Sequence, residues 1–96
     1  MKKEVEERAV KTHELKILPE FFGAHLKGIK NFEVRCNDRD YHVGDILFLQ
    51  EYSPDHGCSG KYLHVEITYI LNDIDYCKDG CVILGTKLRL DLGIVL

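Results

Sequence analysis

Hydrophobic and polar residues alternate in several short segments of the chain, which is the pattern of strands buried on one face. The segment THELKIL at residues 12–18 is the first, and NFEVRC at residues 31–36 is the second. Residues 45–52 have an almost continuous apolar centre, which is typical of a central strand. Alternation returns over residues 61–71, and residues 81–90 form the last predicted strand.

The alternation also assigns side chains to the two faces of each strand. Phe32 and Val34 fall on one face of the second strand, whereas Glu33 and Arg35 share the opposite face. The long strand places four side chains together on one face: Leu63, Val65, Ile67 and Tyr69.

A change of period after residue 18 predicts a short helix over residues 19–27. Phe22 and Leu26 lie four residues apart, and a proline stands at the first helical position. Gly28 can end the helix in a left-handed conformation. His25, beside Leu26, is expected to be exposed.

The remaining segments have turn and loop compositions. Residues 36–40 predict a tight turn, and residues 53–60 and 72–80 predict loops. Gly85 predicts a bulge or a close backbone approach in the last strand. The apolar tail at residues 91–96 either extends that strand or caps one end of the core.

Five strands and one early helix predict an α+β, mainly β fold. We expect a small, strongly curved barrel, mixed or antiparallel, with the helix across one opening. Ninety-six residues fit one domain, with residues 1–10 as a charged lead-in and residues 11–96 as the domain. Ligands of such a barrel bind at its mouth or between helix and sheet.

The charge of the chain limits its partners. Thirteen basic and 16 acidic residues give a net charge of -3, which argues against coating nucleic acid by bulk charge. The first 48 residues hold nine basic and nine acidic side chains, and the last 48 hold four and seven. If a polyanion binds, we expect the first half to bind it.

No apolar run long enough to cross a membrane and no signal peptide is present, so a cytoplasmic location is expected. Only Cys77 and Cys81 lie close together, because Cys36 and Cys58 stand alone in the sequence. This spacing favours free thiols over a zinc site. We expect no metal and no cofactor.

Gly28, Lys30, Glu33 and Arg35 follow the pattern G-x-K-x-x-E-x-R. This pattern resembles the signature of ASCH domains, which are relatives of the PUA-like RNA-binding fold. The run from THELKILPEFF through KNFEVRCNDRDYHVGD to VEITYILND is similar to a small bacterial and phage family of ASCH-like domains without an assigned function. The similarity covers about residues 12–86.

The resemblance implies a small PUA-like mixed β-barrel. Its ligand cleft, between the first helix and the barrel, would be lined by the signature residues and take RNA or a nucleotide. One ASCH branch is an acetylcytidine amidohydrolase whose catalytic lysine matches Lys30. Glu33 stands where that branch has a threonine, and residues 70–96 hold no helix to supply its later glutamate. The departure leaves the known reaction without two of its groups.

Several side chains near this signature are candidates for ligand binding, each with a structural alternative. Lys30 is either a solvated lysine or a cation aimed into the cleft. His13 is either a core histidine or a cleft residue able to exchange protons near neutral pH. The full set of predicted ligand-binding residues is His13, Lys16, Phe22, Lys30, Glu33, Arg35, Arg39 and Tyr41.

Further positions have weaker support. Asp38, Arg39 and Asp40 are most simply turn residues, with Arg39 able to reach a phosphate at the rim. Glu66 and Tyr69 are minor candidates on the long strand.

The leading hypothesis is an RNA- or nucleotide-binding module. A small amidohydrolase acting on an acylated nucleoside, with Lys30 and Glu33 as catalytic residues, is one alternative. A protein-interaction or phage accessory domain is another, in which the charged corner keeps a strand edge from pairing.

Overall fold

The computed structural model describes residues 9–96. Residues 1–8 of the predicted lead-in at residues 1–10 therefore lie outside the described residues. Its last two residues, 9 and 10, belong to no helix or strand. In chain order the elements are β1 (Thr12–Ile17), α1 (Pro19–Leu26), β2 (Phe32–Cys36), β3 (Ile46–Ser53), β4 (Gly57–Leu71), β5 (Cys81–Leu88) and the 3-10 helix η1 (Leu90–Leu92).

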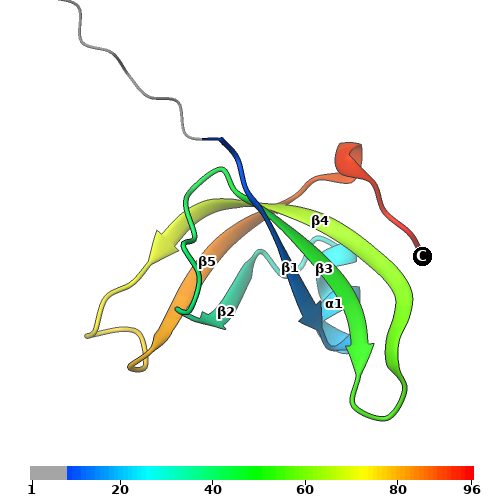
Figure 1. The fold of residues 1–96 in the computed structure, drawn as a ribbon, viewed down its shortest axis with the longest axis horizontal. Coiled ribbons are helices and arrows are strands. Elements are labelled where there is room, and N and C mark those ends of the chain that lie inside the picture. The colour runs from blue at the N-terminus through cyan, green and yellow to red at the C-terminus, as the bar shows by residue number, and fades with distance from the viewer. Residues whose placement is uncertain (1–8) are drawn as a thin grey trace, which may run out of the picture.

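The five strands form one mixed sheet in the order β1-β3-β4-β5-β2. β1 runs parallel to β3, and the three other pairs are antiparallel. The sheet curls into a half-barrel whose two edge strands are β1 and β2 (Figure 1). The mainly β fold with a curved mixed sheet and one helix is therefore confirmed, with the sheet open between these two edges.

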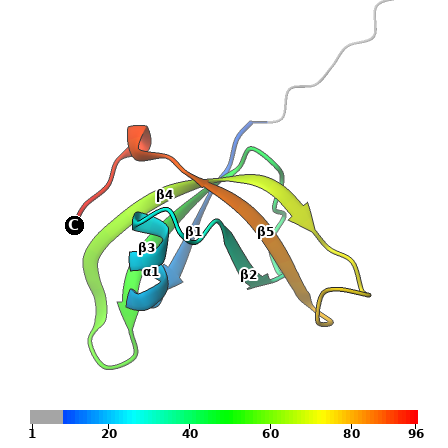
Figure 2. The ribbon, with the colours of Figure 1, turned by 180° about the vertical axis from the view of Figure 1, so that it is seen from behind.

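The helix α1 follows β1 directly and packs against β3 (Figure 2). A proline starts it, where the missing backbone N–H would have had no helical partner. The chain leaves the helix through Gly28, whose φ of 74° is a left-handed conformation that a Cβ would disfavour. The next residues lead straight into β2, so α1 links the two open edges of the sheet.

The hydrophobic core fills the concave side of the sheet. Phe22 of α1 is 3% exposed and joins apolar side chains from four strands. Burying each large apolar side chain stabilises the fold by roughly 1.5–3 kcal/mol. The buried core residues are Leu15, Ile17, Phe22, Leu47, Leu49, Leu63, Val65, Ile67, Val82 and Leu84.

Two predicted boundaries are wrong. β4 begins at Gly57, so the loop predicted over residues 53–60 is only a short turn, in which Ser53 pairs with Gly57. The hairpin residues 51–53 and 57–61 are half-buried or exposed, so neither face of these strands is fully buried. Their sequence therefore lacks the hydrophobic alternation from which a strand is predicted. β5 ends at Leu88 instead of residue 90, because Arg89 leaves the strand to pair with Glu66 and Asp91.

A bulge in β4 corrects the predicted position of Tyr69. The register shifts between Ile67 and Tyr69, so Ile67 is fully buried while Tyr69 is 66% exposed. Gly85 lies opposite Tyr69 in β5. A Cβ at Gly85 would lie 3.1 Å from Thr68 Oγ1 and 3.2 Å from Tyr69 Cβ, which confirms the predicted close approach.

The C-terminal tail returns to the sheet. Tyr62 and Val95 exchange two backbone hydrogen bonds of 2.9 Å, and Ile94 packs against the core. Of the two arrangements predicted for residues 91–96, the structure has the cap over the core.

Candidate functional site

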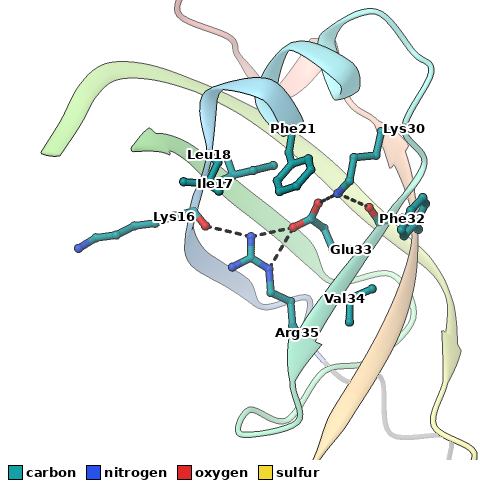
Figure 3. A pocket seen from close by; sticks show the side chains of 9 residues that line it. All are labelled: Lys16, Ile17, Leu18, Phe21, Lys30, Phe32, Glu33, Val34 and Arg35. Carbon is teal, nitrogen blue, oxygen red and sulfur yellow. Dashed lines mark hydrogen bonds and ion pairs between the residues drawn. The ribbon is translucent and has the colours of Figure 1, made fainter. Parts of the chain in front are cut away.

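A cavity of about 350 Å³ opens between the two edge strands, beside the start of α1. β1 supplies one wall, β2 supplies the opposite wall, and α1 closes one end (Figure 3). We call it the upper cavity. Its lining residues are Lys16, Ile17, Leu18, Phe21, Lys30, Phe32, Glu33, Val34 and Arg35.

A second cavity of about 480 Å³, the lower cavity, continues along the same two edges. The two cavities share Lys16, Val34 and Arg35, so they adjoin along these edges, and together we call them the edge groove. Its existence follows from the topology, because a closed barrel would have paired β1 with β2. The lower cavity is lined by Glu14, Leu15, Lys16, Val34, Arg35, Cys36, Asp38, Arg39 and Tyr41.

Strand β2 turns its charged face inward. Glu33 is 3% exposed and lies opposite the buried Leu84 of β5, whereas Phe32 and Val34 are 44% and 54% exposed. A buried carboxylate is costly unless polar partners compensate for the water it loses. The inward orientation of this charged face of β2 therefore depends on the partners of Glu33.

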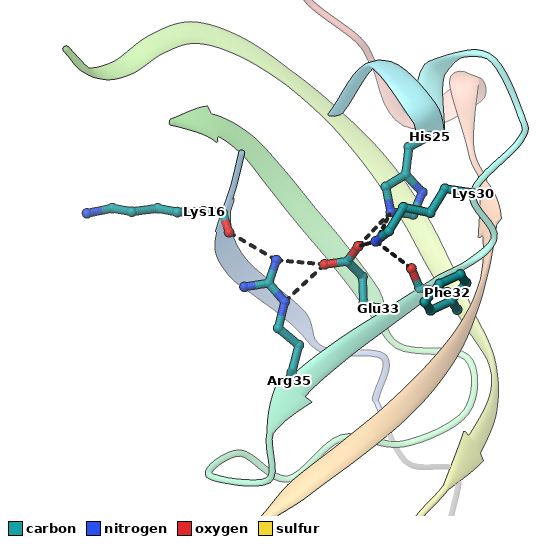
Figure 4. A network of polar contacts seen from close by, with 6 residues as sticks. All are labelled: Lys16, His25, Lys30, Phe32, Glu33 and Arg35. Carbon is teal, nitrogen blue, oxygen red and sulfur yellow. Dashed lines mark hydrogen bonds and ion pairs between the residues drawn. The ribbon is translucent and has the colours of Figure 1, made fainter. Parts of the chain in front are cut away.

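Both carboxylate oxygens of Glu33 have such partners (Figure 4). Arg35 donates from Nε and Nη2 to Oε1, at 3.0 and 2.7 Å. His25 Nε2 lies 2.7 Å from Oε2, and Lys30 Nζ donates to the same oxygen. We call these four residues the Glu33 cluster: Glu33, His25, Lys30 and Arg35.

The cluster strongly favours the ionised form of Glu33. Burial raises the pKa of this carboxyl, but the hydrogen bonds from His25 and Lys30, together with the charge and hydrogen bond of Arg35, outweigh burial. The pKa falls from its ordinary value of 4.5 to about 2. Glu33 is therefore a structural anion at neutral pH.

Lys30 holds its ammonium group at the mouth of the upper cavity. Its Nζ donates to Phe32 O at 2.8 Å as well as to Glu33. The same nitrogen lies 5.2 Å from the ring centroid of Phe21 and 5.0 Å from that of Phe32. Because the Lys30 side chain is 15% exposed, a ligand can still reach the cation between the two rings.

Arg35 connects the two open edges of the sheet. While its Nη2 donates to Glu33 within β2, the same nitrogen donates to the Lys16 carbonyl of β1 at 3.0 Å (Figure 3). A planar guanidinium can make both contacts at once. The Arg35 side chain is 21% exposed and thus forms part of the floor between the upper and lower cavities.

The structure brings six of the eight predicted ligand-binding residues to the edge groove. Lys30 and Glu33 line the upper cavity, Arg39 and Tyr41 line the lower one, and Lys16 and Arg35 line both. Burial raises the pKa of Tyr41, against the opposing charges of Arg39 and Arg35, so its hydroxyl stays protonated at neutral pH.

His13 and Phe22 lie away from the groove. His13 is 8% exposed, and its Nε2 is 2.9 Å from the buried Asp45 carboxylate. Its ring contacts the Tyr41 ring at a tilted angle, with centroids 4.8 Å apart, so His13 packs against a residue that lines the lower cavity. Phe22 belongs to the hydrophobic core.

The expectation that His25 is exposed is wrong. His25 is 2% exposed and contacts Glu33 in the centre of the cluster. A sequence signal for this was present, because His25 lies three residues after Phe22 and one before Leu26, on the face that packs toward the sheet.

Neither aromatic residue of the upper cavity, Phe21 or Phe32, was among the predicted ligand-binding residues. Phe21, 41% exposed, lines it in place of its neighbour Phe22. Once Phe22 and Leu26 face the core, the helical period turns Phe21 away from it. Phe32 and Val34 were missed because alternation alone does not tell which face of an edge strand is buried.

The minor candidates lie outside the groove. Glu66 pairs with Arg89 at 2.6 Å, and Tyr69 points outward beyond the bulge in β4. Within residues 9–96 no three histidine, cysteine, aspartate or glutamate side chains are grouped to hold a metal ion, and all four cysteines are free. The helices of this described part are all too short or too polar to cross a membrane.

A curled sheet with a cation-bordered groove between its open edges defines the chain as a small, mainly β protein. It belongs to the DUF3850 family, a domain of unknown function, whose model matches residues 12–86. An uncharacterized 12.9 kDa protein in the GpA 3′ region of Escherichia phage P2 is 34% identical over 83 residues, which span 83% of this chain and 75% of the phage protein. The family match includes every residue that lines the edge groove.

Proposed function

We propose that the edge groove binds a nucleotide unit, either free or within single-stranded RNA, and that the chain is a PUA-like binding module of the ASCH type. The signature residues support the ASCH assignment, because Lys30, Glu33 and Arg35 meet in one cluster beside the upper cavity. The proposed ligand follows from the surroundings of that cluster.

The observation that carries the proposal is the pair of exposed rings around a cation. Phe21 and Phe32 border the Lys30 ammonium at the mouth of the upper cavity. A nucleobase can stack on an exposed phenyl ring, and its ring acceptors can receive a hydrogen bond from Lys30. A cavity of about 350 Å³ is within the usual range of ligand pockets and suits a single base or nucleoside.

The charge balance of the groove favours an anion. Lys30 and Arg35 contribute two positive charges against the one negative charge of Glu33, so the three groups leave one positive charge. In a partly desolvated groove that charge attracts phosphate more strongly than a fully exposed cation does. A nucleotide supplies both the planar base and the anion.

The lower cavity offers a place for a neighbouring nucleotide. Tyr41 presents a protonated hydroxyl, and Arg39 stands on the rim. A single strand can therefore run from the phenyl rings of the upper cavity, past Arg35, to Arg39. This path involves only one or two phosphates, which agrees with the acidic net charge of the chain.

The amidohydrolase alternative has less support. A carboxylate with a pKa of about 2 is a weak general base at neutral pH, and all the oxygens of Glu33 are already hydrogen-bonded within the cluster.

Fluorescence anisotropy with a labelled single-stranded RNA pentamer tests the proposal, with unlabelled mononucleotides as competitors. Phe21→Ala removes the exposed ring and should weaken binding about tenfold, which is within the roughly 1–3 kcal/mol of a base stack. Tyr76→Ala is the matched control, since Tyr76 is 76% exposed on the β4–β5 loop, outside the groove. It should bind like the wild type.

Competition by a mononucleotide would identify the nucleotide as the recognised unit, whereas binding of the pentamer alone would identify a longer strand. Lys30→Met should weaken binding, while Lys61→Met, at an exposed lysine of β4, should not. The proposal fails if the wild type binds neither probe at roughly 1 mM. Equal affinities for Phe21→Ala and the wild type would also contradict it.

A further inference from the structure

Two cysteines face each other across the edge of the sheet. Cys36, the last residue of β2, is paired in register with Cys81, the first residue of β5. Directly opposed residues of an antiparallel pair project their side chains from the same face of the sheet. The two thiols are therefore neighbours in space, although 45 positions separate them in the sequence.

The hydrogen-bond pattern places this pair at a position suited to a disulfide. Asn37 donates its N–H to Gly80 O at 2.9 Å, which makes the adjoining Asn37–Gly80 pair hydrogen-bonded. Because the two kinds of pair alternate, Cys36 and Cys81 form a non-hydrogen-bonded pair, with Cα atoms about 4.5 Å apart. Disulfides span Cα separations of roughly 4.4–6.8 Å, so the backbone already meets this requirement.

The other two cysteines are placed differently. Cys77 is buried, and its Sγ donates to Leu71 O at 3.2 Å. Cys58 lies in the β3–β4 hairpin opposite Tyr52. Cys36 is exposed and Cys81 is partly exposed, so a small oxidant can reach this pair.

We propose that Cys36 and Cys81 are a disulfide-forming site that reacts with low-molecular-weight disulfides of the oxidised glutathione type. The Cys36 thiolate attacks one sulfur of oxidised glutathione, forms a mixed disulfide and releases one glutathione thiolate. The Cys81 thiolate then attacks the Cys36 sulfur and releases the second glutathione. The two cysteines lose two protons and two electrons, and the electrons reduce the glutathione disulfide to two thiols.

The bond would fasten an edge strand of the sheet. β2 is an edge strand that pairs only with β5, and it carries Glu33 and Arg35 of the Glu33 cluster. A disulfide at its last residue ties it covalently to the body of the sheet. This inference does not depend on what the edge groove binds.

Peptide mapping of the oxidised protein tests the site directly. Cleavage after lysine and arginine puts the four cysteines on four peptides: residues 36–39, 40–61, 62–78 and 79–87. After treatment of the native protein with oxidised glutathione and alkylation of free thiols, peptide 36–39 should be joined to peptide 79–87. Added thiol should separate them.

Single variants supply the controls. Cys58→Ser should give the same cross-linked peptides as the wild type. Cys36→Ser and Cys81→Ser should lose the cross-link completely, and the remaining thiol of the pair should carry one glutathione. Circular dichroism checks that each variant is folded. The proposal is overturned if the folded wild type accumulates only mixed disulfides, or joins either cysteine to Cys58 or Cys77 instead.

Discussion

Glu33 is the residue on which the architecture of the site depends. It lies on the core face of β2, and both its oxygens are bound by side chains from α1, from the segment after α1 and from β2 itself. A carboxylate in this position holds two cations and a histidine that would otherwise lie close together without a counter-charge.

Replacement of Glu33 tests this role. Glu33→Gln keeps the shape of the side chain but removes the charge that Lys30 and Arg35 share, and we expect a loss of about 3 kcal/mol in the free energy of unfolding. Urea unfolding followed by circular dichroism measures the loss. Glu14→Gln, at an exposed position of β1, is the control and should stay within about 0.5 kcal/mol of the wild type. Equal losses in both variants would contradict the assignment.

The same residue predicts a dependence of stability on pH. The pKa of Glu33 is about 2 in the folded protein against an ordinary value of 4.5, so the unfolded chain takes up the proton more readily. Its contribution, roughly 3 kcal/mol, is complete above pH 4.5 and is lost as the pH falls toward 2. Urea unfolding at a series of pH values should show this decline in the wild type. In Glu33→Gln the part of this decline that comes from Glu33 should be absent. If the free energy of unfolding falls with pH in parallel in the two proteins, the prediction is refuted.

For single residues, the sequence predicted which charged side chains meet better than it predicted which side chains of α1 are buried. Lys30, Glu33 and Arg35 were recognisable from their spacing, and the structure places them together. The burial of His25 and the exposure of Phe21 depend on which face of α1 meets β3. A helix of eight residues with a glycine in its middle gives a weak amphipathic signal, so that choice is made by tertiary packing.

At the scale of elements, β2 is an inverted strand. Its charged residues face inward and its apolar residues face outward, which is the reverse of ordinary alternation. The Arg35 contact with the Lys16 carbonyl compensates partly for the missing pairing between the two edge strands. The strand therefore serves as a wall of the groove more than as a part of the core.

Two glycines of these elements allow a matched test of packing. Gly85→Ala should lower the free energy of unfolding by about 1–3 kcal/mol, because the added Cβ would lie 3.1 Å from Thr68 Oγ1 and 3.2 Å from Tyr69 Cβ. Gly23→Ala in α1 meets no atom within 4 Å and should raise it by roughly 0.5–1 kcal/mol. Thermal unfolding of the two variants shows whether the first is less stable and the second more stable than the wild type. Stabilisation by both changes would contradict the bulge geometry.

The strands were largely predictable because alternation is a local signal. All five predicted strands are present, with shifted ends in β4 and β5. The bulge at Thr68 was only partly predictable. Gly85 in β5 indicated a close approach, but no residue pattern in β4 indicated where the register shifts. That residue is set by pairing between distant segments, which no local pattern contains.

At the scale of the whole molecule, the groove exists because the sheet does not close. β1 and β2 stand at opposite ends of the strand order, and α1 with the segment after it joins them. The curvature was foreseen, but the open edges were not, since closure depends on the stagger and tilt of all strands together. The binding surface is therefore a property of the topology more than of any single motif.

The number of phosphates that the groove can contact predicts how binding should respond to salt. With one or two phosphates contacted, the logarithm of the affinity should fall against the logarithm of the salt concentration with a slope of about -0.7 to -1.4. Anisotropy titrations with the RNA pentamer between roughly 50 and 200 mM salt measure the slope. Arg39→Gln should reduce it by about 0.7, while Lys61→Gln should leave it unchanged. A much steeper slope would indicate binding over a larger surface.

The most direct test of the account is a residue-resolved titration. ¹⁵N-labelled protein would be titrated with the RNA pentamer and, separately, with mononucleotides, while two-dimensional NMR spectra follow each backbone amide. We expect the largest shifts at Phe21, at residues 30–35 and at residues 39–41, around both cavities of the edge groove. Absence of shifts at ligand excess, or shifts confined to the β4–β5 loop at residues 72–80, would contradict it.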